Sequence, residues 1–342
     1  MPEYVDHYPR GIGHLAGDLT ALRAWARASD IDKSAFAYRD GMIFLGASAD
    51  GTLLGLDDNR HCLTVAGSRA GKGVSVIVPN LCLYPGSALV IDPKGENAAL
   101  TAARRGAGSP FCEGLGQAVH ILDPFGTVPH HPCASFNPLS VFDLELAESY
   151  DLAIDDAALI ADALVTPGGE RESHWDESAR SVLEMLILHV LTTQPPEFCT
   201  LPRVRQLLMT GDFLDQMQGN DAFDGLIAGA AAALLALGKE ERGSILSTAR
   251  RNTKFLESPA MQRVLEKSDF DLGDLKRCPM TLYLCLPASR LHTHSRWLRL
   301  IIGLALALME REPARPALPV LFLMDEFAAL GKMDVIETAA GL

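Results

Sequence analysis

The sequence predicts an α/β protein whose mostly parallel sheet is interrupted by an all-helical insertion. Short apolar runs alternate with helical patterns in its first and last thirds, whereas helical periodicity alone fills the stretch between them. Strands that alternate with helices are typical of a parallel sheet with right-handed crossovers. We therefore expect a helix and small β-hairpin region (1–60), a first part of the sheet domain (61–148), an all-α insertion (149–270) and a second part of the sheet domain (271–342).

Each element is expected from its local pattern. Helical periodicity covers 15–28, and apolar runs alternate with Gly and Asp over 41–58, as in a hairpin. Apolar and β-branched runs predict strands at 63–65, 87–91, 118–122, 280–286 and 319–324. Helical periodicity predicts helices at 97–105, 152–165, 175–193, 201–210, 223–237, 240–257 and 296–311.

A glycine-rich turn follows the first strand expected in the sheet domain. Such a turn, when it ends in lysine and leads into a helix, holds nucleotide phosphates on backbone N–H groups and on the lysine ammonium group. The pattern departs from the usual P-loop, because Ala66 replaces the first glycine and Gly73 replaces the Ser or Thr that approaches Mg²⁺. We expect the nucleotide site to comprise Ala66, Gly67, Ser68, Arg69, Ala70, Gly71, Lys72, Gly73 and Val74.

A second motif supports this interpretation. The apolar run 319–324 ends in Asp325-Glu326, and the carboxyl end of a parallel strand delivers side chains to the ligand edge of the sheet. Asp325 would hold Mg²⁺, directly or through water, and Glu326 would orient or deprotonate the attacking water. Lys72 and Glu326 are thus the expected catalytic residues, with ATP and Mg²⁺ as cofactors. The alternative is a solvated acid pair at a strand end, and Ser75 is a further candidate ligand for Mg²⁺.

The long separation of the two motifs bears on the class of protein. Small nucleotide kinases and GTPases are complete within a shorter chain than the one that separates Lys72 from Asp325. An insertion of this size indicates a motor or transporter ATPase of the RecA-like group. The expected fold is therefore a RecA-like P-loop NTPase.

Composition excludes several alternatives. The net charge of −13 argues against a broadly basic surface that coats nucleic acid, although a local basic loop remains open. Seven cysteines without a CxxC pair indicate reduced thiols in a cytosolic protein, and the irregular spacing of His130, His131 and Cys133 does not favour a metal site. We expect no signal peptide and no transmembrane helix, since the longest apolar stretch, 298–309, is too short to span a bilayer.

Two basic or acidic clusters have alternative interpretations. Arg250, Arg251 and Lys254 would contact DNA phosphate or a neighbouring subunit's nucleotide, or would lie on a solvated helix face and pair with glutamates. The glutamates in question are Glu240, Glu241 and Glu257. The segment Asp92–Glu96, with Lys94 at its centre, would contact the nucleotide or another subunit, or would cap the following helix.

Two further polar segments lie at expected helix starts. Trp175, within His174–Glu177, would stack on a base or pack into the core at the start of its helix. Thr293, His294 and Arg296 precede the helix expected at 296–311, where we expect a helix start, with a pore role as the alternative.

The chain resembles the type IV secretion coupling proteins, the TraG-like conjugative DNA-transfer ATPases. The resemblance rests on AGSRAGKGVSVIVPNL, IDPKGENAA, LDPF, FNPL, HWDESAR, ERGSILSTARRNTKFLESP and LMDEFAALG. It implies a RecA-like domain with an inserted all-α domain. On the matching positions Gly71, Lys72 and Gly73 would bind phosphate, Asp325 would bind Mg²⁺ and Glu326 would activate water. Gly-Lys-Gly is common in this family, so Gly73 fits it.

The resemblance also implies an assembly and partners. Members usually form a homo-hexameric ring at the cytoplasmic face of the inner membrane. ATP hydrolysis there drives single- or double-stranded DNA with relaxase-type cargo, or recruits protein substrates, into an inner-membrane secretion channel. Members usually carry an N-terminal membrane anchor, and their sheet continues with a sensor residue and a trans-acting arginine, so we expect this chain to be a fragment or a truncated form.

Two alternatives stay open at this point. The first is an ATP-binding, ring-forming adaptor that recruits substrate proteins without motor activity. The second is a cytosolic DNA translocase of the FtsK type, which would serve segregation or defence.

Overall fold

The computed structural model describes residues 35–58, 60–67, 70–166, 173–331, 333 and 336. The chain divides into two compact units, Met1–Pro85 and Gly86–Leu342. The helix expected at 15–28 lies outside the described residues, as do Ser68 and Arg69 of the expected P-loop.

The first unit contains a hairpin and one continuous helical run. Strands β1 (Ile43–Ala47) and β2 (Leu53–Leu56) pair antiparallel, with a register irregularity between Phe44 and Gly46, which confirms the expected hairpin. The helical run opens with a π-helical turn, η3 (Gly73–Ile77), and continues as α1 (Val78–Leu83).

The strand expected at Leu63-Thr64-Val65 is wrong. Residues 61–67 have no regular secondary structure, and the side chains of Leu63 and Val65 are 85% and 84% exposed. A β-branched residue favours a strand mainly through packing against neighbouring strands. Within the described part of the first unit, the hairpin strands pair with each other, and none of them pairs with this segment. Three residues with strand propensity therefore did not suffice.

The second unit is built on a parallel sheet. Its described strands run in the order β6 (Ala118–Leu122), β7 (Met280–Cys285), β3 (Ala88–Asp92) and β8 (Leu321–Met324), and every pairing is parallel. Residues of β3 and β7 are buried throughout, whereas β8, at one edge of this sheet, is half-buried. A short antiparallel pair, β4 (Gly108–Ser109) with β5 (Cys112–Glu113), precedes β6. The parallel sheet expected from the sequence is confirmed.

Helices fill the chain between β6 and β7, as the sequence predicts. The α-helices of the second unit are α2 (Glu96–Arg105), α3 (Ala147–Leu164), α4 (Ser173–Thr193), α5 (Leu201–Met209), α6 (Phe213–Gln218), α7 (Leu226–Ala236), α8 (Lys239–Asn252), α9 (Pro259–Leu265), α10 (Asp274–Arg277) and α11 (Ala288–Arg311). Its 3₁₀ turns are η4 (Pro138–Val141), η5 (Pro196–Phe198), η6 (Lys254–Glu257) and η7 (Phe327–Leu330).

Helix α11 begins earlier than expected. It starts at Ala288, directly after Pro287, and not at 296. Proline fixes its own φ near the helical value and is well suited to a helix start. Pro287 is therefore the local signal for the start of α11, and the search for apolar periodicity did not detect it. Thr293, His294 and Arg296 consequently lie inside the helix, and the expectation that they mark its start is wrong.

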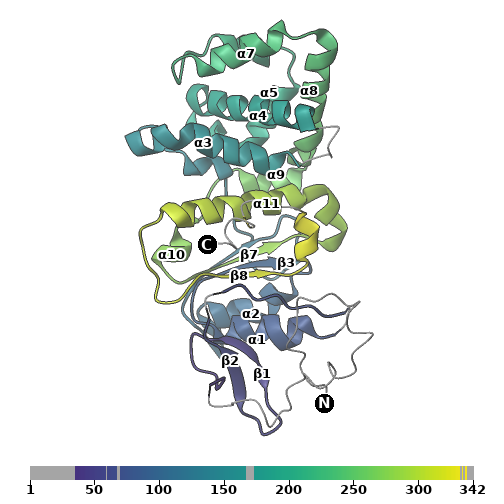
Figure 1. Cartoon of the computed structure of the whole chain (residues 1–342). Helices are drawn as coiled ribbons and strands as arrows, with labels where there is room; N and C mark the ends of the chain where they lie inside the picture. Colours follow the sequence, from purple (N-terminus) through teal and green to yellow (C-terminus); the bar gives the residue numbers. More distant parts are fainter. Residues whose placement is uncertain are drawn as a thin grey trace, which may run out of the picture. The chain divides into compact units, whose positions relative to one another are not determined.

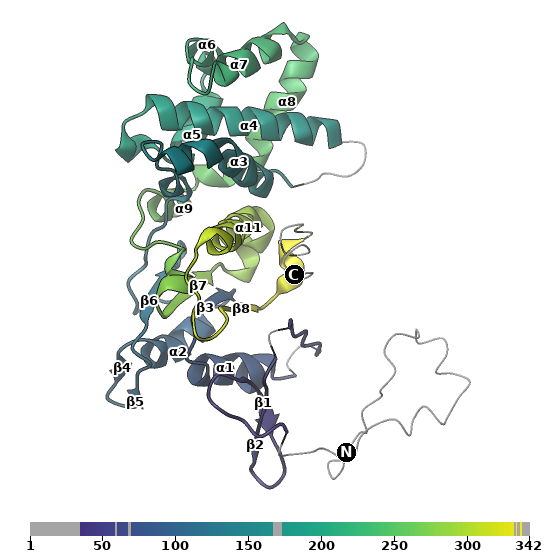
Figure 2. The same cartoon turned by 60° about the vertical axis from the view of Figure 1, so that its left-hand side comes forward.

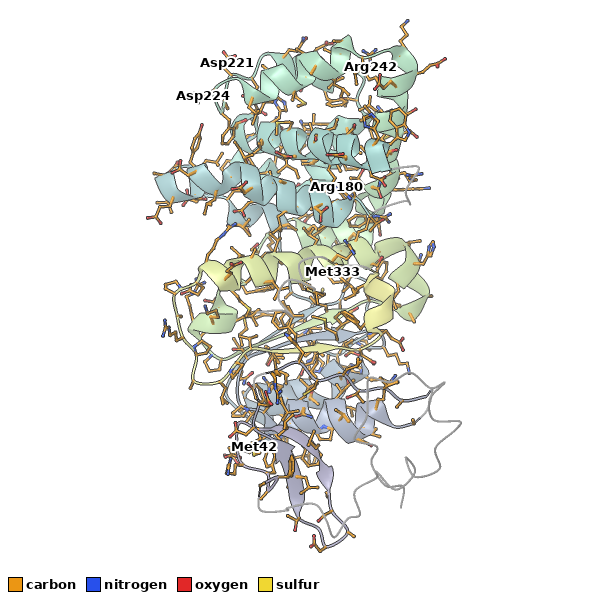
Figure 3. All side chains as sticks on the ribbon, viewed as in Figure 1. Met42, Arg180, Asp221, Asp224, Arg242 and Met333 are labelled. Atoms are coloured by element: carbon orange, nitrogen blue, oxygen red, sulfur yellow. The ribbon has the colours of Figure 1, made fainter. Side chains whose placement is uncertain are left out.

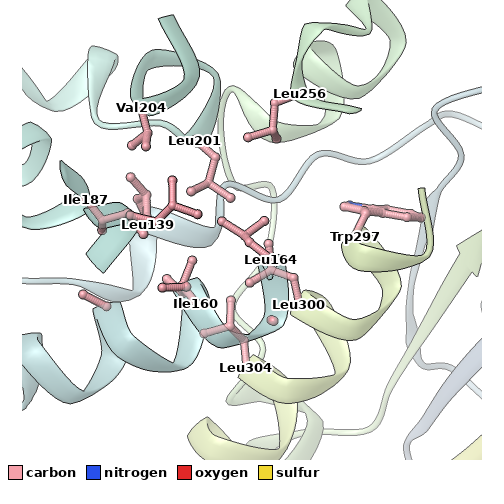
Figure 4. Close-up of a cluster of buried hydrophobic side chains, with 14 of the residues drawn as sticks. Leu139, Ile160, Leu164, Ile187, Leu201, Val204, Leu256, Trp297, Leu300 and Leu304 are labelled. Atoms are coloured by element: carbon pink, nitrogen blue, oxygen red, sulfur yellow. The ribbon is translucent and has the colours of Figure 1, made fainter. Parts of the chain in front are cut away.

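Helix α11 lies between the sheet and the inserted helices (Figures 1 and 2). Its apolar side chains Leu300 and Leu304 pack beside Ile160 and Leu164 of α3, and Leu201 of α5 joins the same cluster (Figure 4). These side chains are at most 1% exposed. The sheet part and the helical insertion therefore share one continuous hydrophobic core.

Ion pairs fasten the insertion at two places. Arg311, in the last turn of α11, binds both carboxylate oxygens of Asp156 on α3, at 2.6 and 2.7 Å. Arg180 on α4, labelled in Figure 3, lies 3.0 Å from a carboxylate oxygen of Asp162 on α3. A bidentate arginine–carboxylate pair also fixes orientation, so the α3–α11 contact is held in one register.

Across the described residues, no helix combines the length and apolarity needed to cross a bilayer.

Candidate nucleotide site

The backbone changes hand at the end of the glycine-rich turn, between Gly71 and Lys72. Gly71 has φ +86°, in the left-handed region, and Lys72 follows with right-handed helical angles, φ −46° and ψ −48°. Consecutive residues of opposite hand point their N–H groups to one side, which is the geometry of an anion-binding nest. The Ala70 N–H donates to the Gly67 carbonyl at 3.3 Å, and the Ser75 N–H donates to the Gly71 carbonyl at 2.9 Å. Between them, the amides of Lys72, Gly73 and Val74 stand where a helix start leaves its N–H groups to a ligand or water.

The opening turn of the helix is wider than an α-helical turn. The Val78 N–H donates to the Gly73 carbonyl, an i→i+5 bond, and π turns of this kind are frequent at functional sites. Gly73 has no heavy atom of another described residue within 4 Å of the place where a Cβ would stand. A phosphate therefore has room to approach the backbone there.

Position 73 has no hydroxyl, but Ser75, two residues further along, carries one. The Ser75 Oγ lies 3.4 Å from the Cβ position of Gly71, beside the turn. Lys72 is half-buried, and within the described residues no carboxylate forms an ion pair with it. Backbone amides, a lysine ammonium group and a serine hydroxyl thus gather at one helix start. This donor set fits a phosphate group and its cation.

The acid pair lies at the carboxyl end of β8. Asp325 is half-buried and Glu326 is exposed, with the Glu326 N–H donating to a carboxylate oxygen of Asp325 at 3.1 Å. Glu326 has φ +55°, a left-handed conformation that is strained for a residue with a Cβ. The backbone reverses there and η7 begins at Phe327. Functional residues are often held in such strained conformations.

The acidic side chains at the ends of β3 and β6 are buried. Asp92, at the end of β3, is 1% exposed and accepts a 2.8 Å bond from the Ala98 N–H. Burial raises its pKa, although backbone N–H groups at the start of α2 oppose that shift. Asp123, after β6, is 6% exposed and accepts a 2.7 Å bond from the Val128 N–H. Their contacts are those of turn and helix caps, so Asp325-Glu326 is the most accessible acidic group at these described strand ends.

The three basic residues at the end of α8 do not share one environment. The Arg250 Nε donates to the Leu208 carbonyl on α5 at 3.1 Å. Arg251 and Lys254 are exposed, and the Arg251 guanidinium lies 4.0 Å from Asp176. Contact with DNA or with a neighbouring subunit stays a prediction for all three.

The glutamates expected as their partners bind elsewhere. Glu257 lies 2.7 Å from Arg205, and Glu241 lies 3.9 Å from His174. Two of the three glutamates, Glu241 and Glu257, therefore contact other residues in the described structure, and the pairing expected for the basic residues stays a prediction.

Trp175 and His294, in the remaining polar segments, both pack against other side chains. Trp175 is half-buried and packs against the core, beside His174 at a ring distance of 5.1 Å. His294 is 6% exposed, lies 5.1 Å from the Phe125 ring, and burial lowers its pKa. No cluster of three or more metal-binding side chains occurs among the described residues.

Comparison with known proteins places these features in a family. The family model described as "Type IV secretory system Conjugative DNA transfer" matches residues 24–342. A conjugal transfer protein TraG of Escherichia coli is 30% identical over 299 residues, which cover 81% of this chain and 45% of that protein. Protein VirD4 of Rhizobium radiobacter is 27% identical over 339 residues, which cover 92% and 46%. The chain thus spans about half the length of the curated relatives it matches.

Solved structures agree on the fold. The plasmid coupling protein TrwB in complex with the GTP analogue GDPNP superposes with a TM-score of 0.63 at 16% identity, over 90% of this chain and 65% of that one. TrwB in complex with ADP and Mg²⁺ gives 0.61 at 17% identity, over 91% and 68%. These likenesses confirm the expected RecA-like P-loop fold. Given the extent of the family match and the identity with TraG, the chain belongs to the type IV secretory system conjugative DNA transfer family, the TraG-like coupling proteins.

Proposed function

We propose that this chain is the nucleotide-driven part of a coupling protein for conjugative DNA transfer. It would bind ATP with Mg²⁺, hydrolyse it, and use the free energy to move DNA or to recruit protein substrates into a type IV secretion channel. The observation that supports the proposal is that one family member carries both a helix start with the nest geometry at Gly71–Lys72 and an accessible acid pair at Asp325-Glu326.

Each residue of the site has a distinct role in this proposal. The backbone amides from Ala66 to Val74 would hold the phosphates, and Lys72 would neutralise charge on the β and γ phosphates. Asp325 would hold Mg²⁺, with the Ser75 hydroxyl as a second ligand. The cation would draw charge from the phosphoryl oxygens when bound. Glu326 would orient the attacking water and accept its proton.

The assembly and its partners belong to the same proposal. A homo-hexameric ring would enclose single- or double-stranded DNA with its relaxase-type cargo and act at the cytoplasmic face of the inner membrane. Arg251, exposed in the last turn of α8, and Lys254, exposed at the start of η6, are the better candidates for phosphate contact. Arg250 would reach a phosphate only by releasing the Leu208 carbonyl.

The test is phosphate release measured with and without DNA. For the wild-type chain we expect Mg²⁺-dependent hydrolysis that DNA stimulates. Lys72→Ala should abolish nucleotide binding, and Glu326→Gln should bind nucleotide and fail to hydrolyse it. Lys239→Ala and Glu310→Gln, which remove an exposed lysine and an exposed glutamate elsewhere, are matched controls and should behave as wild type.

Other outcomes would identify the alternatives. An adaptor would bind nucleotide and recruit substrate proteins equally well in wild type and Glu326→Gln. An FtsK-type translocase would be stimulated by DNA but would not restore plasmid transfer in cells. Hydrolysis that is indifferent to DNA, together with intact transfer in Lys72→Ala, would refute the proposal.

A further inference from the structure

Two arginines one turn apart on α11 bind groups that belong to different parts of the second unit. The Arg299 Nη1 donates to the Leu330 carbonyl at 3.1 Å, and Leu330 ends η7, the turn that follows Asp325-Glu326. The Arg296 Nη2 donates to the Thr166 hydroxyl at 2.8 Å and to the Asn252 amide oxygen at 2.9 Å. Thr166 follows α3 and Asn252 ends α8, so both belong to the helical insertion.

These contacts are well defined. Arg299 is 6% exposed, Leu330 is 3% exposed and Asn252 is 2% exposed. The Asn252 side-chain nitrogen donates to the Thr248 carbonyl at 3.0 Å, which orients its oxygen toward Arg296. A bond from a charged donor to an oriented, buried acceptor is stronger than one between neutral groups, and breaking it leaves the acceptor unsatisfied.

Burial and nearby positive charges disfavour the charged form of the Arg296 guanidinium. Burial lowers its pKa, and the positive charges of Arg251 and Arg299 lower it further, while the nearby Asp176 carboxylate opposes the shift. A guanidinium among like charges keeps its place because the Thr166 and Asn252 oxygens hold it. Its position is therefore sensitive to small movements of the helix that carries it or of the groups that accept its bonds.

We propose that Arg296 and Arg299 are positioning residues that couple the acid-bearing segment Asp325–Leu330 to the helical insertion. Binding of nucleotide would shift η7, and Arg299 would pass this displacement to α11. Arg296, on the same face of the helix, would pass it to the ends of α3 and α8. Figure 1 shows the short yellow helix η7 beside α11, and the pairing of η7 with α11 is among the contacts of the unit. This inference rests on the proposed function, because it requires nucleotide binding.

The physical basis is that α11 is a rigid element packed on both sides. Coupling between two sites needs a structural element whose position both sites can change. Helix α11 meets that need, because Arg299 bonds to Leu330 and Arg296 bonds to Thr166 and Asn252. Arg251 adds a second contact at the same junction, since it lies 4.0 Å from Asp176 at the start of α4. The ends of α3 and α8 therefore meet at one turn of α11, and the start of α4 contacts the end of α8 beside them.

The experiment is amide hydrogen exchange on the whole chain, with and without a non-hydrolysable ATP analogue and Mg²⁺. In wild type we expect the analogue to slow exchange at residues 327–330 and also at 248–252, by at least about fivefold, the lower range of typical allosteric coupling. Arg296→Gln should abolish the response at 248–252 and keep the response at 327–330. Arg299→Gln should raise exchange at 327–330 even without the analogue.

The matched control is Arg311→Gln. Arg311 also fastens α11 to α3 through a buried carboxylate, but it lies at the far end of the helix from Arg299. Its loss should lower thermal stability and leave both responses intact. Arg299→Lys, which keeps a cationic donor, should restore part of the response if Arg299→Gln loses it, and it replaces Arg299→Gln if that variant does not fold.

Several outcomes would overturn the inference. Protection of residues 71–77 by the analogue without any change at 248–252 in wild type would refute it while leaving nucleotide binding established. Loss of the response in Arg311→Gln would show that any loosening of α11 suffices, which would also refute it. A wild-type chain that does not protect residues 71–77 would refute the inference and the proposed function together.

Discussion

The Asn80 side chain binds both backbone polar groups of Phe44. Its amide oxygen accepts from the Phe44 N–H at 2.8 Å, and its amide nitrogen donates to the Phe44 carbonyl at 2.9 Å. The same nitrogen donates to the Val76 carbonyl, one turn back in the helical run. Asn80 is 1% exposed, so it acts as an internal strand partner that joins β1 to the helix that opens at the glycine-rich turn. The hairpin therefore helps to hold the helix that follows the glycine-rich turn.

Asn80→Ala tests this connection. It leaves the Phe44 groups without their partner, and each unsatisfied buried group costs about 1–3 kcal/mol. We expect the free energy of unfolding of the first unit, measured by urea titration, to fall by about 2 kcal/mol, and nucleotide affinity to fall with it. Asp57→Asn, an exposed change in the same unit, is the control. Unchanged unfolding in Asn80→Ala would mean that water replaces the amide.

Gly71 and Gly73 should respond differently to alanine. Gly71 has φ +86°, so an alanine there would be strained by about 1–2 kcal/mol. Gly73 opens the π-helical turn without a left-handed φ and has open space at its Cβ position, so its replacement should not lower stability. We expect thermal melts to separate the two variants, and both to bind nucleotide less tightly. Equal melting temperatures would indicate that the turn adapts.

The sequence predicted the buried strands well. The runs at 87–91, 118–122, 280–286 and 319–324 match β3, β6, β7 and β8 to within a few residues, because a strand covered on both faces needs apolar side chains throughout. The run at 63–65 failed because the neighbours that would make it a strand are not encoded locally. The start of α11 was missed because polar side chains in its first turns concealed the helical pattern that Pro287 begins.

The candidate site could be predicted from the sequence where its residues lie at the ends of regular elements. Gly71, Lys72 and the acid pair Asp325-Glu326 stand at the ends of regular elements, where local sequence is informative. The sequence could not predict that Arg250, rather than Arg251, bonds to the Leu208 carbonyl of α5. Adjacent residues of a helix point in different directions, and the position of α5 decides which of them it contacts. Their functional roles, like the domain boundaries, stay predictions.

His189 should make the fold sensitive to acid. It is 3% exposed, and its Nδ1 lies 3.0 Å from the Asn220 side-chain nitrogen, whose amide is oriented because its oxygen accepts from the Ala222 N–H. An amide nitrogen donates, so this ring nitrogen accepts and the imidazole is neutral. Burial lowers the pKa of His189.

A lowered pKa means that the unfolded chain takes up a proton before the folded chain does. Stability is therefore complete above the unfolded value of about 6.5 and falls as the pH drops below it, by up to about 1.4 kcal/mol per pH unit. We expect His189→Gln, whose amide oxygen can accept the same bond, to flatten the decline measured by urea unfolding between pH 7 and pH 5. His130→Gln, at an exposed position, is the control. An undiminished slope in His189→Gln would show that other groups govern the acid response.

Glu326 combines a strained backbone conformation with a carboxylate that is proposed to act in hydrolysis. Its φ of +55° disfavours any residue with a Cβ, whereas glycine adopts this conformation without strain. Glu326→Gly should therefore raise the free energy of unfolding by about 1 kcal/mol, while Glu326→Gln should leave it unchanged. Both variants should lose hydrolysis, because each removes the carboxylate that would accept the proton. Urea unfolding and phosphate release, measured on the same samples, separate the two effects. A glycine variant that is no more stable than the glutamine variant would show that the turn carries no strain, and a glycine variant that still hydrolyses ATP would show that Glu326 is not the group that activates water.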